Sequence, residues 1–175
     1  MKFTELELKD AYLIELEPFF DERGMFSRQF CKREFEAVGI DFEICQCNVS
    51  ANKKAGTLRG MHYQTEPYAE PKLVSCITGA FIDVIIDLRE TSPTYLKYEK
   101  VELKENDHKI LYVPPNFAHG FKTLVDNTIV YYQLGNYFMI DYYKGLRYND
   151  PKIGIDWGNT SKIIINERDN SYELL

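Results

Sequence analysis

Four short stretches of the sequence concentrate side chains that could hold or transform an anionic, ring-shaped molecule. They are residues 19–26 (FFDERGMF), 46–64, 114–121 (PPNFAHGF) and 130–138. Arginine binds phosphate oxygens, histidine exchanges protons near neutral pH, and aromatic rings pack against sugars and bases. Taken singly, each stretch has a simpler explanation, such as a solvated turn or a core aromatic residue. Only their combination indicates a binding or catalytic site.

The cysteine spacing gives little support to metal or redox chemistry. Cys45 and Cys47 form C-x-C rather than the C-x-x-C of a redox turn or zinc knuckle, so we expect the four cysteines to be buried, reduced thiols. A metal site that combines Cys45 and Cys47 with two of His62, His108 and His119 is a minor alternative. No metal and no cofactor are therefore expected.

Composition places these stretches in an ordinary globular chain. The 175 residues fit a single domain over 1–175, and the balance of 21 basic against 27 acidic residues, a net charge of −6, argues against nucleic acid as a partner. No apolar stretch approaches the ~20 residues that a membrane-spanning helix needs. The first ten residues lack the apolar core of a signal peptide, so the expected location is the cytoplasm.

Alternating apolar residues predict mostly strands. Val84 and Ile86 alternate with Asp83 and Asp87, which is typical of a strand with one apolar face. The predicted strands cover residues 42–49, 73–77, 81–88, 98–103, 110–113 and 128–134, with a possible final strand at 161–169. One short helix is expected at 31–38, ended by Gly39. This pattern predicts an all-β fold, an antiparallel sandwich or barrel.

In their order and spacing, the four stretches resemble one known family. The most specific pieces are residues 56–64 (GTLRGMHYQ), 114–121 and 147–151 (RYNDP), and the similarity extends from residue 17 to residue 169. The chain resembles the dTDP-4-dehydrorhamnose 3,5-epimerases, which are isomerases of nucleotide-linked deoxysugars. The resemblance implies a cupin-type jelly-roll β-barrel with one or two short helices. It also implies a homodimer formed by exchange of N-terminal strands, in which residues 19–26 reach the neighbouring subunit's site.

The resemblance further implies epimerisation of a nucleotide-linked 4-keto-6-deoxyhexose at C3 and C5. The keto group acidifies both C–H bonds, because loss of either proton gives an enolate at O4. Inversion then needs a base on one ring face, an acid on the other and a cation near O4. By resemblance, His62 is the base, held by Asp169, Tyr132 is the acid, and Lys72 is the cation. This chemistry requires no cofactor.

A substrate-binding set also follows from the resemblance. Arginines would hold the diphosphate, amide and imidazole groups would hold nucleotide or sugar oxygens, and aromatic rings would pack on the nucleoside. The set comprises Phe19, Arg23, Phe26, Arg28, Gln46, Asn48, Arg59, His119, Phe138 and Arg168. Arg28 and the region of Tyr143 depart from the family pattern, which has glutamates at these two positions. The sequence therefore leaves open whether the sugar is linked to dTDP or to another nucleotide.

Three alternatives accompany this interpretation. Within the family, the chain could invert only C3 or only C5, or use a CDP- or GDP-linked sugar. A metal cupin such as an oxygenase is a second alternative, although His62-Tyr63-Gln64 lacks the H-x-H of such sites. A non-catalytic nucleotide-sugar binding module is the third.

The spacing of Arg59 and His62 raises a structural question. Their odd separation places them on opposite faces of an ideal strand, although both are expected in one site. Either Gly60 marks a β-bulge, or Arg59 reaches the site from the edge of the strand.

Overall fold

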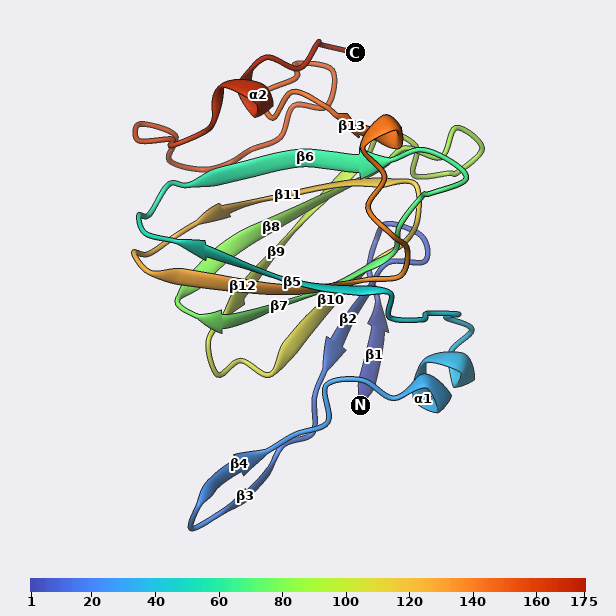
Figure 1. Cartoon of the computed structure of the whole chain (residues 1–175), viewed down its shortest axis with the longest axis vertical. Helices are drawn as coiled ribbons and strands as arrows, with labels where there is room; N and C mark the ends of the chain where they lie inside the picture. Colours follow the sequence, from blue (N-terminus) through green and yellow to red (C-terminus); the bar gives the residue numbers. More distant parts are fainter.

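The computed structural model describes residues 1–175, which fold mainly into antiparallel strands (Figure 1). One sheet has the order β1-β2-β10-β7-β12-β5, the other β13-β6-β11-β8-β9, and β3 and β4 form a separate hairpin. The elements are β1 Lys2–Glu5, β2 Tyr12–Glu15, β3 Phe19–Asp21, β4 Gly24–Phe26, α1 Lys32–Ala37, β5 Gln46–Asn52, β6 Leu58–Gln64, β7 Lys72–Thr78, β8 Ala80–Asp87, β9 Tyr98–Lys104, β10 Lys109–Val113, β11 Phe117–Thr123, β12 Thr128–Leu134, η1 Ile140–Tyr142, β13 Tyr143–Gly145 and α2 Glu167–Asn170.

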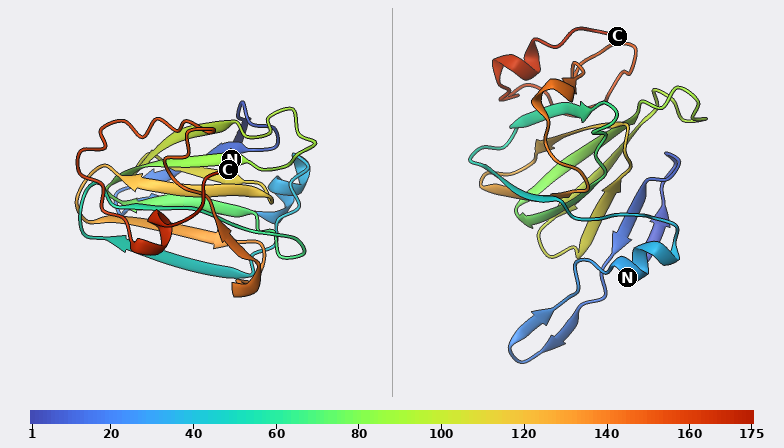
Figure 2. Two further views of the ribbon diagram at one scale, coloured as in Figure 1. Left: turned by 90° about the horizontal axis from the view of Figure 1, so that it is seen from above. Right: turned by 45° about the vertical axis from the view of Figure 1, so that its right-hand side comes forward.

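Strands β5 to β12 form a jelly roll. Four of them take the order β10-β7-β12-β5 in one sheet, and the other four take the order β6-β11-β8-β9 in the second sheet. The sheets lie face to face as two layers (Figure 2). The largest apolar cluster fills the space between them, with Val74 and Val130 from one sheet and Phe81, Ile85 and Leu103 from the other. Burial of this shared face holds the two layers together.

Two further apolar clusters cover the outer faces of the sheets. Phe35 of α1 packs with Ile14 and Tyr112 against the six-stranded sheet. On the five-stranded sheet, Val84 packs with Ile153 and Trp157 of the C-terminal segment. Strand β8 is therefore buried on both faces, and the prediction of one apolar face for this strand was incomplete.

Most predicted elements are present, with two corrections. The expected strand at 161–169 is wrong: Ile164 makes a single bridge to Thr57, and the chain then enters α2. The side chain of Asn166 accepts a hydrogen bond from the Asp169 N–H and so caps this helix, which a strand would not allow. The strand expected at 42–49 begins and ends later, at Gln46–Asn52.

The cysteines are all free but less buried than expected. Cys31, Cys45 and Cys76 are half-buried, and Cys47 is exposed. Cys47 lies on β5, an edge strand whose residues alternate between partly buried and exposed positions. No helix in the structure is both long enough and apolar enough to cross a bilayer.

The β3–β4 hairpin projects from the barrel and exposes an apolar surface (Figure 1). Phe19, Phe20 and Phe26 are 66%, 63% and 75% exposed, and Met25 is 47% exposed. A two-stranded hairpin of this kind is only marginally stable in water. Its exposed aromatic rings are typical of a surface that packs against another chain.

Candidate active site

A β-bulge at Gly60 brings Arg59 and His62 to the same cavity. In the pairing of β6 with β11, His62 lies opposite His119, whereas Arg59 lies opposite Phe121. Three steps on β6 therefore match two steps on β11, which confirms the bulge and excludes the strand-edge alternative. Gly60 has φ +125°, and a Cβ there would lie 2.6 Å from the Cα of Gly120. Only glycine tolerates both this positive φ and this close approach to Gly120, because it has no Cβ.

Gly60→Ala is expected to lower both stability and activity, because the new methyl group would push β6 away from β11 and rotate Arg59 or His62 out of the cavity. Gly24→Ala is a matched control, since Gly24 has φ +126° and no neighbour within 4 Å of its added Cβ. Backbone strain alone costs about 1–3 kcal/mol. Thermal unfolding should therefore show a larger loss for Gly60→Ala than for Gly24→Ala. Equal losses would mean that the close approach to Gly120 is unimportant.

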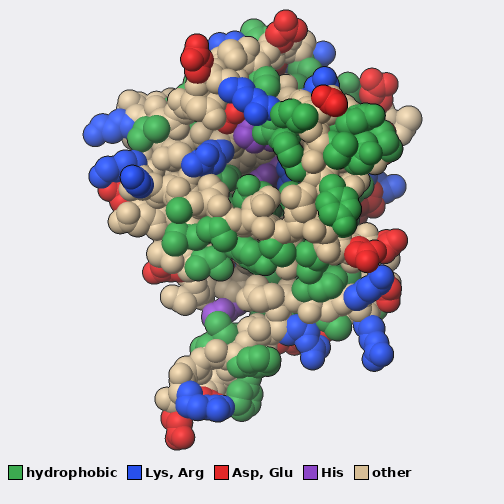
Figure 3. All heavy atoms as spheres, in the orientation of Figure 1, with side chains coloured by type: hydrophobic (Ala, Val, Ile, Leu, Met, Phe, Trp, Pro, Cys, Tyr) green, Lys and Arg blue, Asp and Glu red, His purple; other side chains and the backbone are tan.

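The candidate active site is a cavity of about 570 Å³ between the two sheets. Figure 3 shows a hollow on this face of the molecule, with histidine side chains between basic and apolar ones. The predicted residues that line it are Gln46, Asn48, Arg59, His62, Lys72, His119, Tyr132, Phe138, Arg168 and Asp169. His62 comes from β6 of one sheet and Tyr132 from β12 of the other, so the imidazole and the phenol approach from opposite walls.

His62 and Asp169 form a directly hydrogen-bonded pair. The His62 Nε2 lies 2.8 Å from the Asp169 Oδ1, and the Asp169 Oδ2 accepts the Gly60 N–H at 3.0 Å. Burial opposes ionisation of Asp169, but the hydrogen bonds from His62 and Gly60 outweigh it and hold the pKa of Asp169 below its usual value. Since Asp169 engages Nε2, the Nδ1 of His62 is left for a substrate. Asp169 thereby fixes the tautomer of His62.

Burial lowers the pKa of His62 below its usual 6.5, even though Asp169 favours the protonated form. His62 is therefore neutral at pH 7 and able to accept a proton. We expect kcat/KM to fall as the pH is lowered through this pKa, with the midpoint of the acid limb below 6.5. A pH–rate profile measures it, and a midpoint above 6.5 would contradict a neutral, desolvated base.

Tyr132 is suited to donate a proton. Burial raises the pKa of its phenol, with Glu70 acting in the same direction, while Arg59 and a hydrogen bond with Asn48 act against it. The phenol therefore carries its proton at neutral pH. Asn48 is its direct partner in the pairing of β5 and β12, which places both side chains in the cavity.

Lys72 lies in a buried ion pair that the sequence did not reveal. Its Nζ is 3.1 Å from the Glu70 Oε1, and both side chains are less than a tenth exposed. The other oxygen of Glu70 accepts a hydrogen bond at 2.9 Å from the Gln64 Nε2. A buried carboxylate fixes the direction of the ammonium and compensates its charge. Glu70 was missed because it stands in a loop between a proline-containing turn and β7, where acidic residues are usually solvated.

Two arginines in the cavity have no carboxylate partner. The Arg59 Nε donates to the Asn52 Oδ1 at 2.9 Å, and the guanidinium of Arg168 lies 4.4 Å from the centre of the Tyr143 ring. Tyr143 in turn packs against Phe138, with ring centroids 5.4 Å apart. Guanidinium groups without a carboxylate partner, one of them over an aromatic ring, suit a ligand that carries both phosphate and a flat ring.

A second histidine–aspartate pair lies beside the first. His119 is 8% exposed, and its Nε2 lies 2.7 Å from the Oδ1 of Asp83, a fully buried carboxylate. The two atoms are close, but they are not well aligned for a hydrogen bond. Asp83 was missed because an aspartate that alternates with isoleucine and valine suggests a solvated strand face. Its direct pairing with Phe121, a core residue, places it inside the barrel instead.

Four predicted binding residues lie outside this cavity in the same chain. Phe19 and Phe26 belong to the projecting hairpin, and Arg23 at its tip pairs with Asp21. Arg28 follows the hairpin and makes an ion pair with Glu34 at 2.9 Å. A single chain therefore does not bring Phe19, Arg23, Phe26 or Arg28 to His62.

The fold and the cavity together define a class of protein. A jelly-roll barrel that holds a neutral histidine, a protonated tyrosine and unpaired arginines in one cavity is an acid–base enzyme for an anionic small molecule. The family model described as dTDP-4-dehydrorhamnose 3,5-epimerase matches residues 5–175. The chain belongs to this family, which confirms the predicted isomerase class and the cupin-type fold.

Curated relatives and solved structures agree with this assignment. The dTDP-4-dehydrorhamnose 3,5-epimerase of Sinorhizobium fredii is 39% identical over 100% of this chain and 90% of its own length. The Bacillus anthracis enzyme of the same name, solved with TDP and PPi bound, is 40% identical, covers 99% of both chains and has a TM-score of 0.94. A Legionella pneumophila dTDP-6-deoxy-D-glucose-3,5-epimerase in complex with dTDP-4-keto-L-rhamnose is 30% identical, covers 99% and 92%, and has a TM-score of 0.93.

Proposed function

We propose that this enzyme converts dTDP-4-dehydro-6-deoxy-D-glucose to dTDP-4-dehydro-L-rhamnose by inverting C3 and C5. The observation that carries the proposal is the placement of His62 and Tyr132 on opposite walls of one cavity. Two structural neighbours, solved with TDP and PPi and with dTDP-4-keto-L-rhamnose, support a nucleotide-sugar ligand in this fold.

In the proposed reaction, the Nδ1 of His62 removes the proton from C3 or C5. The electron pair of the broken C–H bond forms a double bond to C4, and the π pair of the C4 carbonyl moves onto O4. The Lys72 ammonium stabilises the resulting enolate oxygen. Tyr132 then donates its proton to the same carbon from the opposite face, which inverts the configuration. The Asp169 carboxylate holds the imidazole in place and stabilises its protonated form. Each inversion exchanges one carbon-bound hydrogen for one from the enzyme and ultimately from solvent.

Substrate binding follows from the charges in the cavity. Arg59 and Arg168 are the free cations, and we assign them to the diphosphate. Phe138 is 47% exposed at the rim and lies against Tyr143, so we assign the nucleoside base to this pair of rings. Gln46 accepts the Phe138 N–H, which fixes the backbone beneath that ring. Asn48 and His119 complete the polar wall for sugar oxygens.

We further propose a homodimer in which the β3–β4 hairpin of one chain reaches the cavity of the other. This arrangement would cover the exposed rings of Phe19 and Phe26 and would bring Arg23 towards the diphosphate. Arg28 would then add positive charge near the nucleotide. Light scattering on wild type and Phe26→Asp tests the assembly. The expected result is a dimer that weakens in Phe26→Asp, together with a rise in KM, and a monomeric, fully active wild type would contradict it.

The proposed substrate is tested by comparing dTDP-, CDP- and GDP-linked 4-keto-6-deoxyglucose under identical conditions. NMR of the products reports the configuration at C3 and C5. We expect inversion at both carbons and the highest kcat/KM for the dTDP sugar. A preference for CDP or GDP would assign a different nucleotide, and inversion at one carbon would make the enzyme a mono-epimerase. No inversion with any of the three would overturn the proposed function.

A further inference from the structure

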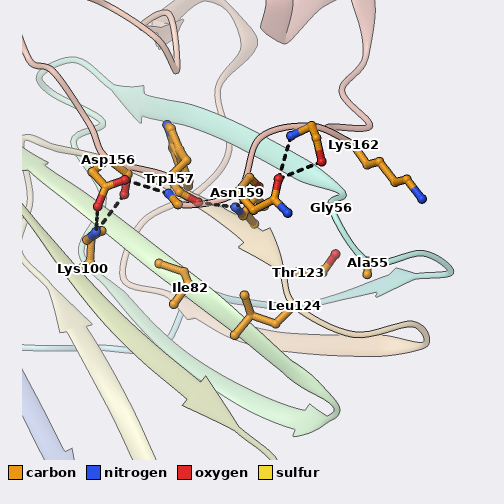
Figure 4. Close-up of a pocket in the computed structure, with 13 residues that line it drawn as sticks. Ala55, Gly56, Ile82, Lys100, Thr123, Leu124, Asp156, Trp157, Asn159 and Lys162 are labelled. Atoms are coloured by element: carbon orange, nitrogen blue, oxygen red, sulfur yellow. Dashed lines mark hydrogen bonds and ion pairs between the residues drawn. The ribbon is translucent and has the colours of Figure 1, made fainter.

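A second cavity, of about 670 Å³, lies on the outer face of the five-stranded sheet (Figure 4). We call it the outer cavity. Ile82 of β8, Lys100 of β9 and Lys122 of β11 line one side of it, and residues 156–162 of the C-terminal segment line the other. Side chains alternate along β11, so His119 faces the candidate active site and Lys122 faces outward. The two cavities share β11 but no lining residue.

Lys122 is a buried cation without a counter-ion. The residue is 5% exposed, and its ammonium donates to the backbone oxygens of Trp157 and Asn159, the latter at 2.9 Å. It forms no ion pair with a carboxylate, and burial lowers the pKa of its ammonium. An ammonium has three N–H donors, of which two are accounted for here. The charge of Asp156 favours the ammonium but does not outweigh its burial, and an anion in the outer cavity would offset the remaining cost.

The remaining charges of the outer cavity also favour an anion. Lys100 is held by Asp156, with its Nζ 2.8 Å from both a carboxylate oxygen and the backbone oxygen of that residue (Figure 4). Asp156 is the one acidic residue that lines the cavity and is thereby neutralised. Lys162 lines the other end of the cavity, but Figure 4 shows its ammonium directed away from Asn159. The Lys122 charge is therefore the one left for a ligand.

The neutral residues of the outer cavity add donors and an apolar wall. The Asn159 Oδ1 accepts both the N–H and the O–H of Ser161, at 3.0 and 2.7 Å, which leaves the Asn159 amide N–H groups for a ligand. Ile82, Leu124 and Trp157 provide apolar surface. A phosphate group offers several acceptor oxygens to such donors, and lysine binds it as a point charge. The volume lies in the range of about 300–1,000 Å³ typical of small-molecule sites.

We propose that the outer cavity is a second binding site, separate from the candidate active site, that takes a small phosphorylated organic molecule with its phosphate on Lys122 and Asn159. The apolar wall at Ile82, Leu124 and Trp157 receives the organic part. The alternative is a purely structural role, in which Lys122 only holds the C-terminal segment in place. This alternative predicts that no ligand binds in the outer cavity.

Trp157 makes this proposal directly testable, because it is the single tryptophan of the chain and lines the outer cavity. Its fluorescence is recorded during titration with glucose 1-phosphate and with inorganic diphosphate, with sodium chloride at matched ionic strength as reference. We expect a saturable change with glucose 1-phosphate. Saturation by diphosphate as well would show that the phosphate group suffices for binding, and both results support the site.

Variants test whether the ligand binds in the outer cavity. Lys122→Met should abolish the response. Asn159→Asp keeps an oxygen for Ser161 but puts a negative charge beside the phosphate, so it should weaken binding about tenfold. Lys104→Gln, an exposed lysine elsewhere on β9, is the matched control and should bind as wild type. Arg59→Gln should also retain the response, since Arg59 lines only the candidate active site.

Two outcomes would overturn the proposal. One is a fluorescence change no larger than that caused by sodium chloride. The other is an unchanged response in Asn159→Asp together with an unchanged response in Lys122→Met, in which case Lys122 only clamps the C-terminal segment. If Lys122→Met fails to fold, the comparison of Asn159→Asp with Lys104→Gln decides the question by itself.

Discussion

Replacement of His62 by asparagine is expected to abolish proton exchange at both C3 and C5 of the 4-keto sugar. The asparagine side chain keeps a polar group near Asp169 but cannot accept a proton at neutral pH. General-base catalysis accelerates a reaction by about 10²–10⁴-fold, and here the same base serves both carbons. We therefore expect kcat to fall by a factor of at least about 10². The measurement is loss of the C3 and C5 proton signals in D2O, followed by NMR.

The control for His62→Asn is binding. Arg59 and Arg168, which we assign to the diphosphate, are unchanged in the variant, so the affinity for dTDP should stay within a few-fold of wild type. Exchange at the wild-type rate in His62→Asn would show that another group is the base. Exchange lost at one carbon only would show that the two carbons use different bases.

Replacement of Tyr132 by phenylalanine should separate proton removal from inversion. The ring still packs between Asn48 and Val74, its direct partners on the two neighbouring strands, but the donor on that face of the sugar is gone. We expect His62 to continue exchanging protons on its own face, while net inversion slows by about 10²–10⁴-fold. Deuterium should then enter with retained configuration.

NMR of the recovered substrate and the product distinguishes these outcomes for Tyr132→Phe. The expected result is deuterated starting sugar with little epimer. Asn48→Ala is a useful comparison, because it removes the hydrogen-bond partner of Tyr132 but leaves the phenol. Inversion at the wild-type rate in Tyr132→Phe would mean that solvent or another residue supplies the proton.

Local pattern predicted β5, β7, β8, β9, β10 and β12, with shifted bounds for β5. It predicted no strand for β6 or β11, which carry His62 and His119. It could not place the elements that depend on distant contacts. The bulge at Gly60 is required by the close approach of Gly120, 60 residues later in the sequence, and nothing near Gly60 shows that approach. Residues 161–169 were predicted as a possible final strand running into a turn, whereas the cap from Asn166 starts a helix that contains Asp169.

The sequence predicted residues of the candidate site only where they belong to the motifs shared with the family. His62, Tyr132, Lys72 and Asp169 lie in one cavity as expected. Glu70, the partner of Lys72, and Asp83, the partner of His119, were missed, because a carboxylate near an apolar strand usually indicates solvent exposure rather than a buried pair. Arg23 and Phe26 lie in the projecting β3–β4 hairpin, and the fold of the single chain does not bring them to the cavity.

The proposed mechanism requires that His62 and Tyr132 act on one sugar ring from opposite sides. The most direct test is the wild-type reaction in D2O with dTDP-4-keto-6-deoxyglucose, with NMR of the product. We expect deuterium at both C3 and C5, each with inverted configuration. Product formed without deuterium at either carbon, or no exchange at all with this substrate, would contradict the mechanism.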